Sequence, residues 1–300
     1  SVPDDPNPNI RNDEALERIR GNIIKMPETI EQIKSRVKEA QKNYFGNLLI
    51  LEGILQNERG YVSRIQKNEN VVALCSGGLD SIVMINKLIE DYHVFIHPLF
   101  IKRGARAEKL EENAFDFFMG FYKKRFPDKM KEGFKLEYQV PPKELKKGFP
   151  KELSLTQGLP LRNSTMQNLA VMYAVSLNEI NARTILSAST RDDNTEPEQG
   201  LLSLRAQTLS ACIQLGDWNW NITSPLTDYY ITDTQITKSD LIKYAIQKFI
   251  PLDKTRSCFT SDEIACGTCL ACQKRLIAFK NAEMNDPVEY KTEEIKNDCP

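Results

Sequence analysis

The feature that most constrains this chain is a glycine-containing loop that directly follows a short apolar run. Residues 71–75 are all apolar, which is typical of a strand buried on both faces of a parallel sheet. A helical pattern opens at the end of the loop, whose residues are Ser76, Gly77, Gly78, Leu79, Asp80 and Ser81. The two glycines allow the backbone to turn sharply and to approach a ligand closely. The sequence therefore predicts a strand–loop–helix unit with a ligand-binding turn.

The same alternation continues along the chain. Apolar or alternating runs predict further strands over 94–101, 134–140, 184–188 and 220–223. Helical spacing predicts helices over 82–89, 106–126, 163–177, 201–215 and 238–249. Strands that alternate with helices form a parallel sheet covered on both faces. We therefore expect an α/β fold with a doubly wound, mostly parallel sheet.

The loop at 76–81 has the properties of a phosphate site. The N–H groups of a first helical turn have no partners inside the helix, and together with the helix dipole they attract anions. Ser76 and Ser81 add hydroxyl donors. Asp80 repels a bare phosphate, so we expect it to cap backbone amides or to hold a magnesium ion that bridges phosphates. The loop is not a Walker A loop, because it lacks the Gly-Lys-Ser or Gly-Lys-Thr that such a loop needs.

A second constellation is a group of closely spaced cysteines: Cys258, Cys266, Cys269 and Cys272. Four thiolates suit a tetrahedral zinc ion and leave no open position, so the predicted site is structural. Gly267 permits the chain to turn between two of them. An iron–sulfur cluster and cytosolic disulfides are the alternatives.

The chain is expected to have three parts. Residues 1–66 form an N-terminal helical extension, because apolar residues recur at three- and four-residue spacing from Ile30 and a second apolar stretch covers 48–55. Residues 67–256 form the α/β domain, and 257–300 form the four-cysteine segment. The apolar stripe of the extension is expected to pack on its own domain, with binding of a partner protein as the alternative.

Charge and hydropathy limit the partners. The formal net charge is -1, which argues against a broad nucleic-acid-binding face. No apolar run approaches the roughly 20 residues that a membrane span needs, and the first residues lack the apolar core of a signal peptide. We therefore expect a cytoplasmic protein without a membrane partner. We expect the four phenylalanines of one helical run to lie in the core, namely Phe115, Phe117, Phe118 and Phe121. Cys75 is expected to be a small buried apolar side chain, and His97 is expected to have a structural role.

The loop matches all five specified positions of Ser-Gly-Gly-x-Asp-Ser, and so it resembles the pyrophosphate loop (PP-loop) of the N-type ATP pyrophosphatases. Together with the four cysteines, the chain is similar to the 7-cyano-7-deazaguanine synthase family. The similarity extends to Pro160-Leu161-Arg162-Asn163, to Pro225-Leu226 followed by Lys238, to Ser257-Cys258-Phe259 and to Arg275. The resemblance implies an adenine nucleotide alpha hydrolase-like fold.

The resemblance also implies an activity. Members of this family act in queuosine biosynthesis, where they use ATP, Mg²⁺ and Zn²⁺ to adenylate the carboxylate of 7-carboxy-7-deazaguanine. Ammonia then displaces AMP to give an amide, and a second ATP converts the amide to the nitrile. On this resemblance the loop holds the pyrophosphate leaving group. The candidate catalytic residues are Arg162, Lys238 and Asp80. The positive charges of Arg162 and Lys238 would stabilise the charge that develops on phosphate.

One region departs from the family. After its fourth strand the family carries Tyr-Pro-Asp near the substrate, whereas this chain has Glu196-Pro197-Glu198. The candidate substrate residues are Asn163, Asp193, Glu196 and Glu198. Because of the altered loop and the N-terminal extension, the identity of the nucleophile that receives the acyl group stays open. Relatives in anti-phage defence operons imply one alternative, which is conjugation of the deazaguanine acid to an amine of a partner protein. A catalytically idle scaffold is an alternative of another class, and the family implies a homodimer.

Overall fold

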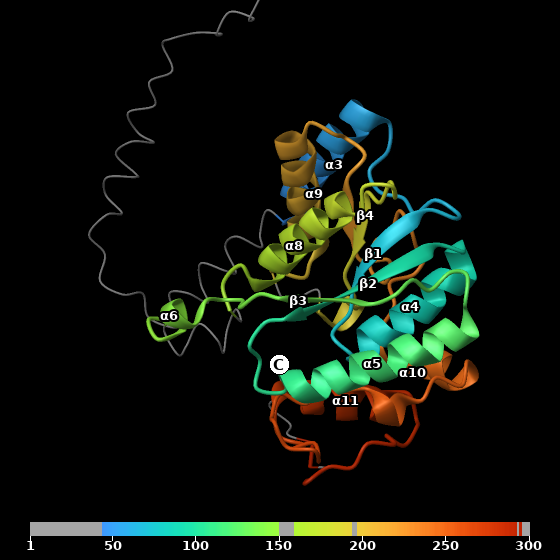
Figure 1. The fold of residues 1–300 in the computed structure, drawn as a ribbon, viewed down its shortest axis with the longest axis vertical. Coiled ribbons are helices and arrows are strands. Elements are labelled where there is room, and N and C mark those ends of the chain that lie inside the picture. The colour runs from blue at the N-terminus through green and yellow to red at the C-terminus, as the bar shows by residue number, and fades with distance from the viewer. Residues whose placement is uncertain (1–43, 150–158, 194–196, 293, 296–300) are drawn as a thin grey trace, which may run out of the picture. The chain divides into compact units, whose positions relative to one another are not determined.

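A computed structural model describes residues 44–149, 159–193, 197–292 and 294–295. Its centre is a parallel sheet with the strand order β3-β2-β1-β4-β5 (Figure 1). The strands are β1 (Asn70–Leu74), β2 (Phe95–Lys102), β3 (Phe134–Glu137), β4 (Thr184–Leu186) and β5 (Asn221–Thr223). Each of the predicted strands is present, and β3, β4 and β5 are shorter than their predicted runs.

The order of the strands creates a switch point. From β1 the chain builds outward through β2 to β3, and it then returns to place β4 on the other side of β1. In open α/β sheets, ligands bind in the crevice outside the carboxyl ends of the strands at such a reversal. We therefore expect the residues that follow β1 and β4 to line a ligand site.

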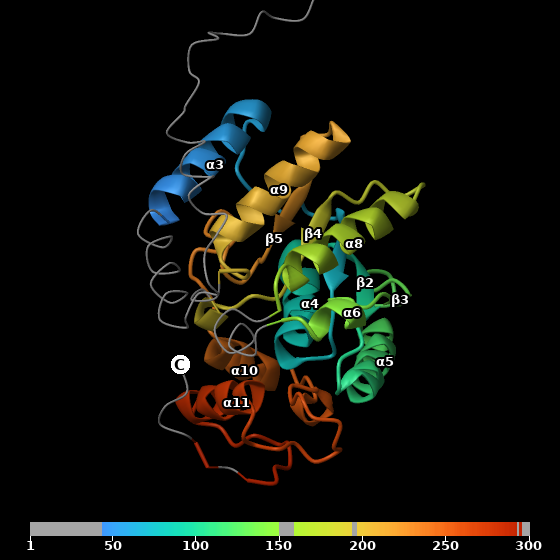
Figure 2. The same ribbon diagram turned by 90° about the vertical axis from the view of Figure 1, so that its left-hand side faces the viewer.

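Helices cover both faces of the sheet, as expected for a doubly wound fold (Figures 1 and 2). On one face α8 (Arg162–Ser176) packs on β1 and β4, and α9 (Leu201–Leu215) packs on β5. On the other face α4 (Leu79–Tyr92) packs on β1 and β2, and α5 (Glu108–Arg125) packs on β2. The predicted α/β class is confirmed.

The remaining helices extend this frame. Helix α10 (Lys238–Gln247) packs between α4 and α11 (Leu270–Asn281), which carries the last cysteine of the cluster. Helix α6 (Lys143–Lys146) and the short 3-10 helices η1 (Arg191–Asp193) and η2 (Leu252–Lys254) lie in connections. The sequence patterns did not predict α6 or α11. No helix in the part of the chain that the structure describes is long and apolar enough to cross a membrane.

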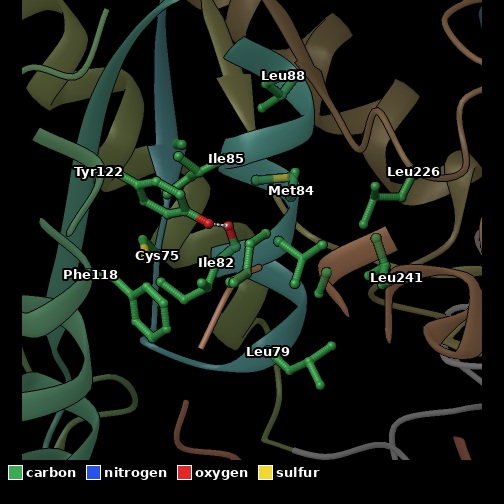
Figure 3. Packing of buried hydrophobic residues seen from close by; sticks show 14 of the residues in the cluster. Cys75, Leu79, Ile82, Met84, Ile85, Leu88, Phe118, Tyr122, Leu226 and Leu241 are labelled. Carbon is green, nitrogen blue, oxygen red and sulfur yellow. Dashed lines mark hydrogen bonds between the residues drawn. The ribbon is translucent and has the colours of Figure 1, made fainter. Parts of the chain in front are cut away.

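The core is densest around α4, which is covered by the sheet, α5 and α10. Ile82 and Ile85 of α4 are fully buried, and the Tyr122 hydroxyl of α5 donates a 2.7 Å hydrogen bond to the Ile82 carbonyl (Figure 3). Cys75 lies in the same cluster, as expected for a small apolar side chain, and burial raises the pKa of its thiol to about 11. Phe117 is 41% exposed, so its expected place in the core is wrong. Its ring nevertheless contacts that of the fully buried Phe118 edge to face, with 5.2 Å between ring centroids.

The helix α3 (Tyr44–Arg59) corresponds to the second apolar stretch of the predicted extension. Its buried Glu52 carboxylate accepts hydrogen bonds from Arg205 of α9 at 3.1 Å and from the Tyr229 hydroxyl at 2.5 Å. Arg205 is also bound to Asp228 through two hydrogen bonds, of 2.7 and 2.8 Å. Buried charges must be paired, and this network meets that requirement for a helix that begins 26 residues before β1.

The chain divides into two units between Tyr44 and Phe45. Nearly all of α3 thus belongs to the same unit as the sheet. The first predicted helical stretch, from Ile30, lies outside the described residues. The boundaries at 66/67 and 256/257 stay predictions.

Candidate active site and metal centre

The loop after β1 leaves the first turn of α4 open for a ligand. Gly78 is the N-cap residue, with extended backbone angles (φ -77°, ψ 158°) and no capping side-chain hydrogen bond. The first hydrogen bond of the helix runs from the Ile82 N–H to the Gly78 carbonyl at 3.1 Å. The N–H groups of residues 79–81 therefore precede the helical ladder. Ser81 Oγ donates to the Gly78 carbonyl at 3.1 Å, and the Ser76 hydroxyl accepts from the Gly78 N–H at 3.4 Å.

Gly77 shows why this loop needs glycine. Its φ is +75°, and an added Cβ would lie 2.5 Å from the Glu111 carbonyl oxygen of α5. The Gly77 carbonyl accepts a 2.9 Å hydrogen bond from the Arg256 N–H. The loop is therefore held between α5 and the segment that leads to the cysteine cluster. The predicted backbone freedom of this glycine is confirmed.

A cavity of about 280 Å³ opens beside the loop at the switch point of the sheet. It is bounded by the carboxyl ends of β1, β2 and β4 and by the N-terminus of α8. Four loop residues line it, which are Ser76, Gly78, Asp80 and Ser81. Leu79 belongs instead to the core, where it is 2% exposed. The three predicted site residues Arg162, Asn163 and Glu198 also line the cavity.

Lys238 and Asp80 form an ion pair at the base of the loop. Lys238 is the first residue of α10, and a capping box between Thr237 and Asp240 fixes that helix end. Burial disfavours the charge on Lys238, but Asp80 and Asp193 outweigh burial and raise the pKa of the ammonium group. Lys238 is not among the residues that line the cavity. The second oxygen of Asp80, Oδ1, is buried and has no hydrogen-bond partner among the described residues.

Glu198 contacts the start of α8. The backbone N–H groups of Leu161, Arg162 and Asn163 act on its carboxylate and favour its charged form, which acts to lower its pKa. It thus lies at the positive end of the helix, a placement that the sequence did not predict. Burial raises the pKa of Glu198, although Arg162 acts in the opposite direction. Its predicted contact with a substrate stays a prediction.

Of the other two candidate substrate residues, the structure describes only Asp193. Asp193 accepts hydrogen bonds from the Thr190 N–H at 3.1 Å and from the Thr190 hydroxyl at 2.9 Å, and it is not among the residues that line the cavity. Its other oxygen lies 3.6 Å from Lys274 Nζ. Glu196 lies outside the described residues.

Arg103 is a cavity residue that sequence reasoning missed. It follows β2 directly, and its guanidinium lies 3.0 Å from the Glu111 carboxylate on α5. Both side chains line the cavity. The available signal was position: a charged residue at the carboxyl end of a strand that neighbours the loop strand lies where doubly wound sheets bind ligands.

The four predicted metal ligands come together in space. The Sγ atoms of Cys258, Cys266, Cys269 and Cys272 all lie within 4.8 Å of one another. Two of the separations are 3.6 Å, between Cys258 and Cys266, and 4.0 Å, between Cys266 and Cys272. None of the four is in a disulfide. This geometry suits a single metal ion held by four thiolates.

Local backbone structure shapes the cluster. The Cys266 N–H points at Cys258 Sγ and the Cys269 N–H points at Cys266 Sγ, each at 3.3 Å. Gly267 has φ +75°, and a Cβ there would lie 1.7 Å from the Thr292 carbonyl oxygen. Cys269 is the N-cap of α11, so Cys272 lies on the first turn of that helix. The predicted turn at Gly267 is confirmed.

Two arginines connect the cluster to the rest of the molecule. Arg275 of α11 is buried and pairs with Asp286 at 2.7 and 2.9 Å. The Arg256 guanidinium donates to the carbonyls of Thr260, Asp262 and Glu263 at 2.6 to 3.0 Å. Because the Arg256 N–H also binds Gly77, one residue joins the phosphate loop to the loop that follows the first cysteine.

Comparison with known proteins agrees with this architecture. The model of the family described as "Queuosine biosynthesis protein QueC" matches residues 130–283. A 7-cyano-7-deazaguanine synthase of Thermoplasma acidophilum is 30% identical over 236 residues, which cover 75% of this chain and 93% of the relative. A 7-cyano-7-deazaguanine synthase of Chloroherpeton thalassium is 29% identical, with coverage of 73% of this chain and 96% of the relative.

Solved structures with some likeness include NMN synthetase from Francisella tularensis, with a TM-score of 0.41 and 11% identity over 82% of this chain and 87% of that one. The U34-tRNA thiolase NcsA from Methanococcus maripaludis has a TM-score of 0.38 and 15% identity over 81% of this chain and 75% of that one. The sequence relatives carry the assignment, since the family model spans half of the chain and the Thermoplasma enzyme is matched over nearly its whole length. The chain therefore belongs to the QueC family and is an ATP-dependent carbon–nitrogen ligase.

Proposed function

We propose that this enzyme adenylates the carboxylate of 7-carboxy-7-deazaguanine and transfers the resulting acyl group to ammonia. The observation that carries the proposal is the cavity at the switch point, where an uncapped helix N-terminus faces the same space as two arginines. An open N-terminus attracts the phosphates of ATP, and the arginines add positive charge where negative charge develops.

The proposed reaction proceeds through an acyl-adenylate. A carboxylate oxygen attacks the α-phosphorus of ATP, the bond from that phosphorus to the oxygen bridging the β-phosphate breaks, and pyrophosphate leaves. Ammonia then attacks the acyl carbon, AMP departs with the former carboxylate oxygen, and an amide forms after loss of a proton. A second ATP activates the amide oxygen in the same way. Loss of AMP with that oxygen, together with the two amide protons, leaves the nitrile.

The loop residues 76–81 would bind the pyrophosphate leaving group through backbone N–H groups and the Ser76 and Ser81 hydroxyls. Arg162 is the candidate that stabilises charge at the α-phosphate, since a guanidinium binds two phosphate oxygens at once. Lys238 is the candidate that orients Asp80 through their ion pair. Asn163 lines the same cavity and remains a candidate substrate contact.

Asp80 also has the chemistry to hold Mg²⁺. Its buried Oδ1 has no partner among the described residues, and a carboxylate oxygen is the ligand type that this hard cation prefers. A magnesium ion bound there would neutralise part of the phosphate charge.

The four-cysteine cluster is proposed to hold zinc. A tetrahedral ion with Zn–S bonds of about 2.3 Å places its sulfurs about 3.8 Å apart. The Cys258–Cys266 and Cys266–Cys272 separations of 3.6 and 4.0 Å lie on either side of that value. A multi-iron cluster puts each thiolate on a different iron and separates the sulfurs further. A disulfide would bring two sulfurs to about 2 Å. Four thiolates leave no open position on zinc, so its proposed role is to hold α11 and the neighbouring loop in place.

The acceptor of the acyl group is the finer part of the proposal. We prefer ammonia as the acceptor because this chain matches two 7-cyano-7-deazaguanine synthases over nearly their whole length. An amine on a partner protein, as in the defence relatives, remains the alternative acceptor. A homodimer remains a separate proposal, and a catalytically idle scaffold remains the alternative of another class. About a quarter of this chain lies outside the match to the Thermoplasma enzyme, which leaves room for a partner-binding segment.

The test combines nucleotide analysis with mass spectrometry. The enzyme is incubated with ATP, Mg²⁺, 7-carboxy-7-deazaguanine and ammonium, and pyrophosphate, AMP and small-molecule products are quantified. We expect two AMP and two pyrophosphate per nitrile. Arg162→Gln should reduce turnover at least 100-fold, whereas the exposed Arg106→Gln serves as the matched control. Pyrophosphate release that does not depend on the acid would refute the proposal. A mass shift on a co-expressed protein, without free nitrile, would favour the protein amine.

A further inference from the structure

Two polar side-chain atoms in the cavity wall are buried without hydrogen-bond partners among the described residues. They are Oε1 of Gln167 on α8 and Oγ of Ser187, which directly follows β4. Gln167 is 3% exposed, and both residues line the cavity beside the phosphate loop. They come from two elements that pack together in the fold, since α8 lies against β4.

These atoms carry a cost that the fold alone does not explain. A buried polar atom without a partner destabilises the folded state by about 1–3 kcal/mol, and an apolar residue of similar shape avoids that cost. In the part of the chain that the structure describes, neither side chain holds another residue in place through a hydrogen bond. Buried unpartnered groups in a binding cavity are explained when a ligand supplies the missing hydrogen bonds.

The rest of the cavity wall indicates the shape of that ligand. Apolar side chains form much of the wall. They come from the strands and the residues after them (Leu74, Leu99, Phe100 and Ala188), from α8 (Met166) and from the segment after Cys258 (Phe259). Apolar walls suit the faces of a flat ring, while a few polar groups select its edge. A carboxamide offers an acceptor and a donor side by side, which matches the edge of an amino-bearing base. A serine hydroxyl both donates and accepts.

We propose that Gln167 and Ser187 form a base-recognition subsite that binds the polar edge of an amino-bearing bicyclic base. This inference rests on the proposed function, which places two such bases in the reaction, the adenine of ATP and the deazaguanine of the acid. The shared chemistry is an N–H or amino group that donates to Oε1 and Oγ. The subsite holds one of the two bases, and the experiment identifies which.

The experiment measures equilibrium binding by calorimetry with two probes, α,β-methylene-ATP with Mg²⁺ and 7-carboxy-7-deazaguanine. The proteins are the wild type, Gln167→Leu, Ser187→Ala and the control Gln214→Leu, which makes the same chemical change at an exposed position of α9. We expect Gln167→Leu to weaken one probe about tenfold, as for a lost buried hydrogen bond. Ser187→Ala should weaken the same probe, and the control should weaken neither.

A second readout separates binding from folding. The melting temperature of unliganded Gln167→Leu should equal or exceed that of the wild type, because the variant removes an unpartnered buried atom. A lower melting temperature combined with weaker binding of both probes would show a structural role and overturn the subsite. Dissociation constants that stay within twofold of wild type for both variants would overturn it as well.

The proposed function can fail separately. A wild type that binds both probes but releases no pyrophosphate would refute the ligase reaction and leave the subsite standing. If the wild type makes the nitrile and both variants bind the two probes like wild type, the ligase reaction stands and the subsite is refuted. Binding of neither probe to the wild type would overturn both.

Discussion

Alanine at Gly77 provides the sharpest test of the phosphate loop. A residue with a side chain pays about 1–2 kcal/mol to adopt the left-handed conformation that Gly77 has at φ +75°. In addition, its Cβ would lie 2.5 Å from the Glu111 carbonyl oxygen and 3.0 Å from Ala114 Cβ. The first contact is with backbone, which cannot rotate away. The loop must therefore shift by an appreciable fraction of an ångström.

Gly60 is the matched control because it separates conformation from contact. Its φ is +78°, and an added Cβ there meets no atom within 4 Å. Gly60→Ala should therefore lose only the conformational cost, about 1–2 kcal/mol, and retain full activity. Gly77→Ala should lose a further 1–3 kcal/mol, roughly the cost of overpacking.

The assays are denaturant unfolding and pyrophosphate release at saturating substrates. A displacement of about 1 Å at a reacting group can cost roughly 100-fold in rate, so Gly77→Ala should retain about 1% of wild-type turnover. Equal stability losses in the two variants would refute the contact argument. A Gly77→Ala enzyme whose turnover stays within threefold of wild type would show that the loop does not position the phosphates.

Three further predictions follow from groups outside the loop. Glu52→Leu leaves Arg205 buried with only Asp228 as its charged partner, and we expect a loss of about 3 kcal/mol in the free energy of unfolding; a loss below 1 kcal/mol would contradict the role of this pair in holding α3. Burial lowers the pKa of His97 to about 4. Between pH 6.5 and 4 the imidazole therefore binds a proton in the unfolded chain but not in the folded protein. The stability of the wild type relative to His97→Gln should therefore fall by up to about 2 kcal/mol from pH 7 to pH 5, and a constant difference would count against the shift. Finally, Cys269→Ser should abolish zinc in elemental analysis and lower the melting temperature, whereas Cys299→Ser should leave one zinc per chain; full zinc content in Cys269→Ser would exclude that cysteine as a ligand.

Local patterns predicted much of the fold. The strand before the loop and the helix after it were both foreseen, because apolar periodicity and glycine placement are properties of neighbouring residues. Phe117 shows the limit of that reasoning: an apolar residue inside an aromatic run still points to solvent when its helical position faces outward. Helix α11 was missed because cysteines that serve a metal site obscure the apolar pattern of its first turn.

The candidate site was likewise predictable only in part. The phosphate loop and the four cysteines were recognisable because each needs particular residue types at short spacing, and that requirement is written in adjacent positions. The structure alone placed Arg103 in the cavity, assigned Glu198 to the N-terminus of α8 and paired Lys238 with Asp80. The unpartnered atoms of Gln167 and Ser187 also emerged only in three dimensions.

By itself, therefore, the sequence determined the α/β class, the loop after the first strand and the cysteine set, since these depend on backbone conformation and on ligand types close together in the chain. Tertiary structure decided which side chains share the cavity and which satisfy one another. Those outcomes depend on contacts between residues far apart in sequence, such as Asp80 with Lys238, and on how burial removes water from each polar group.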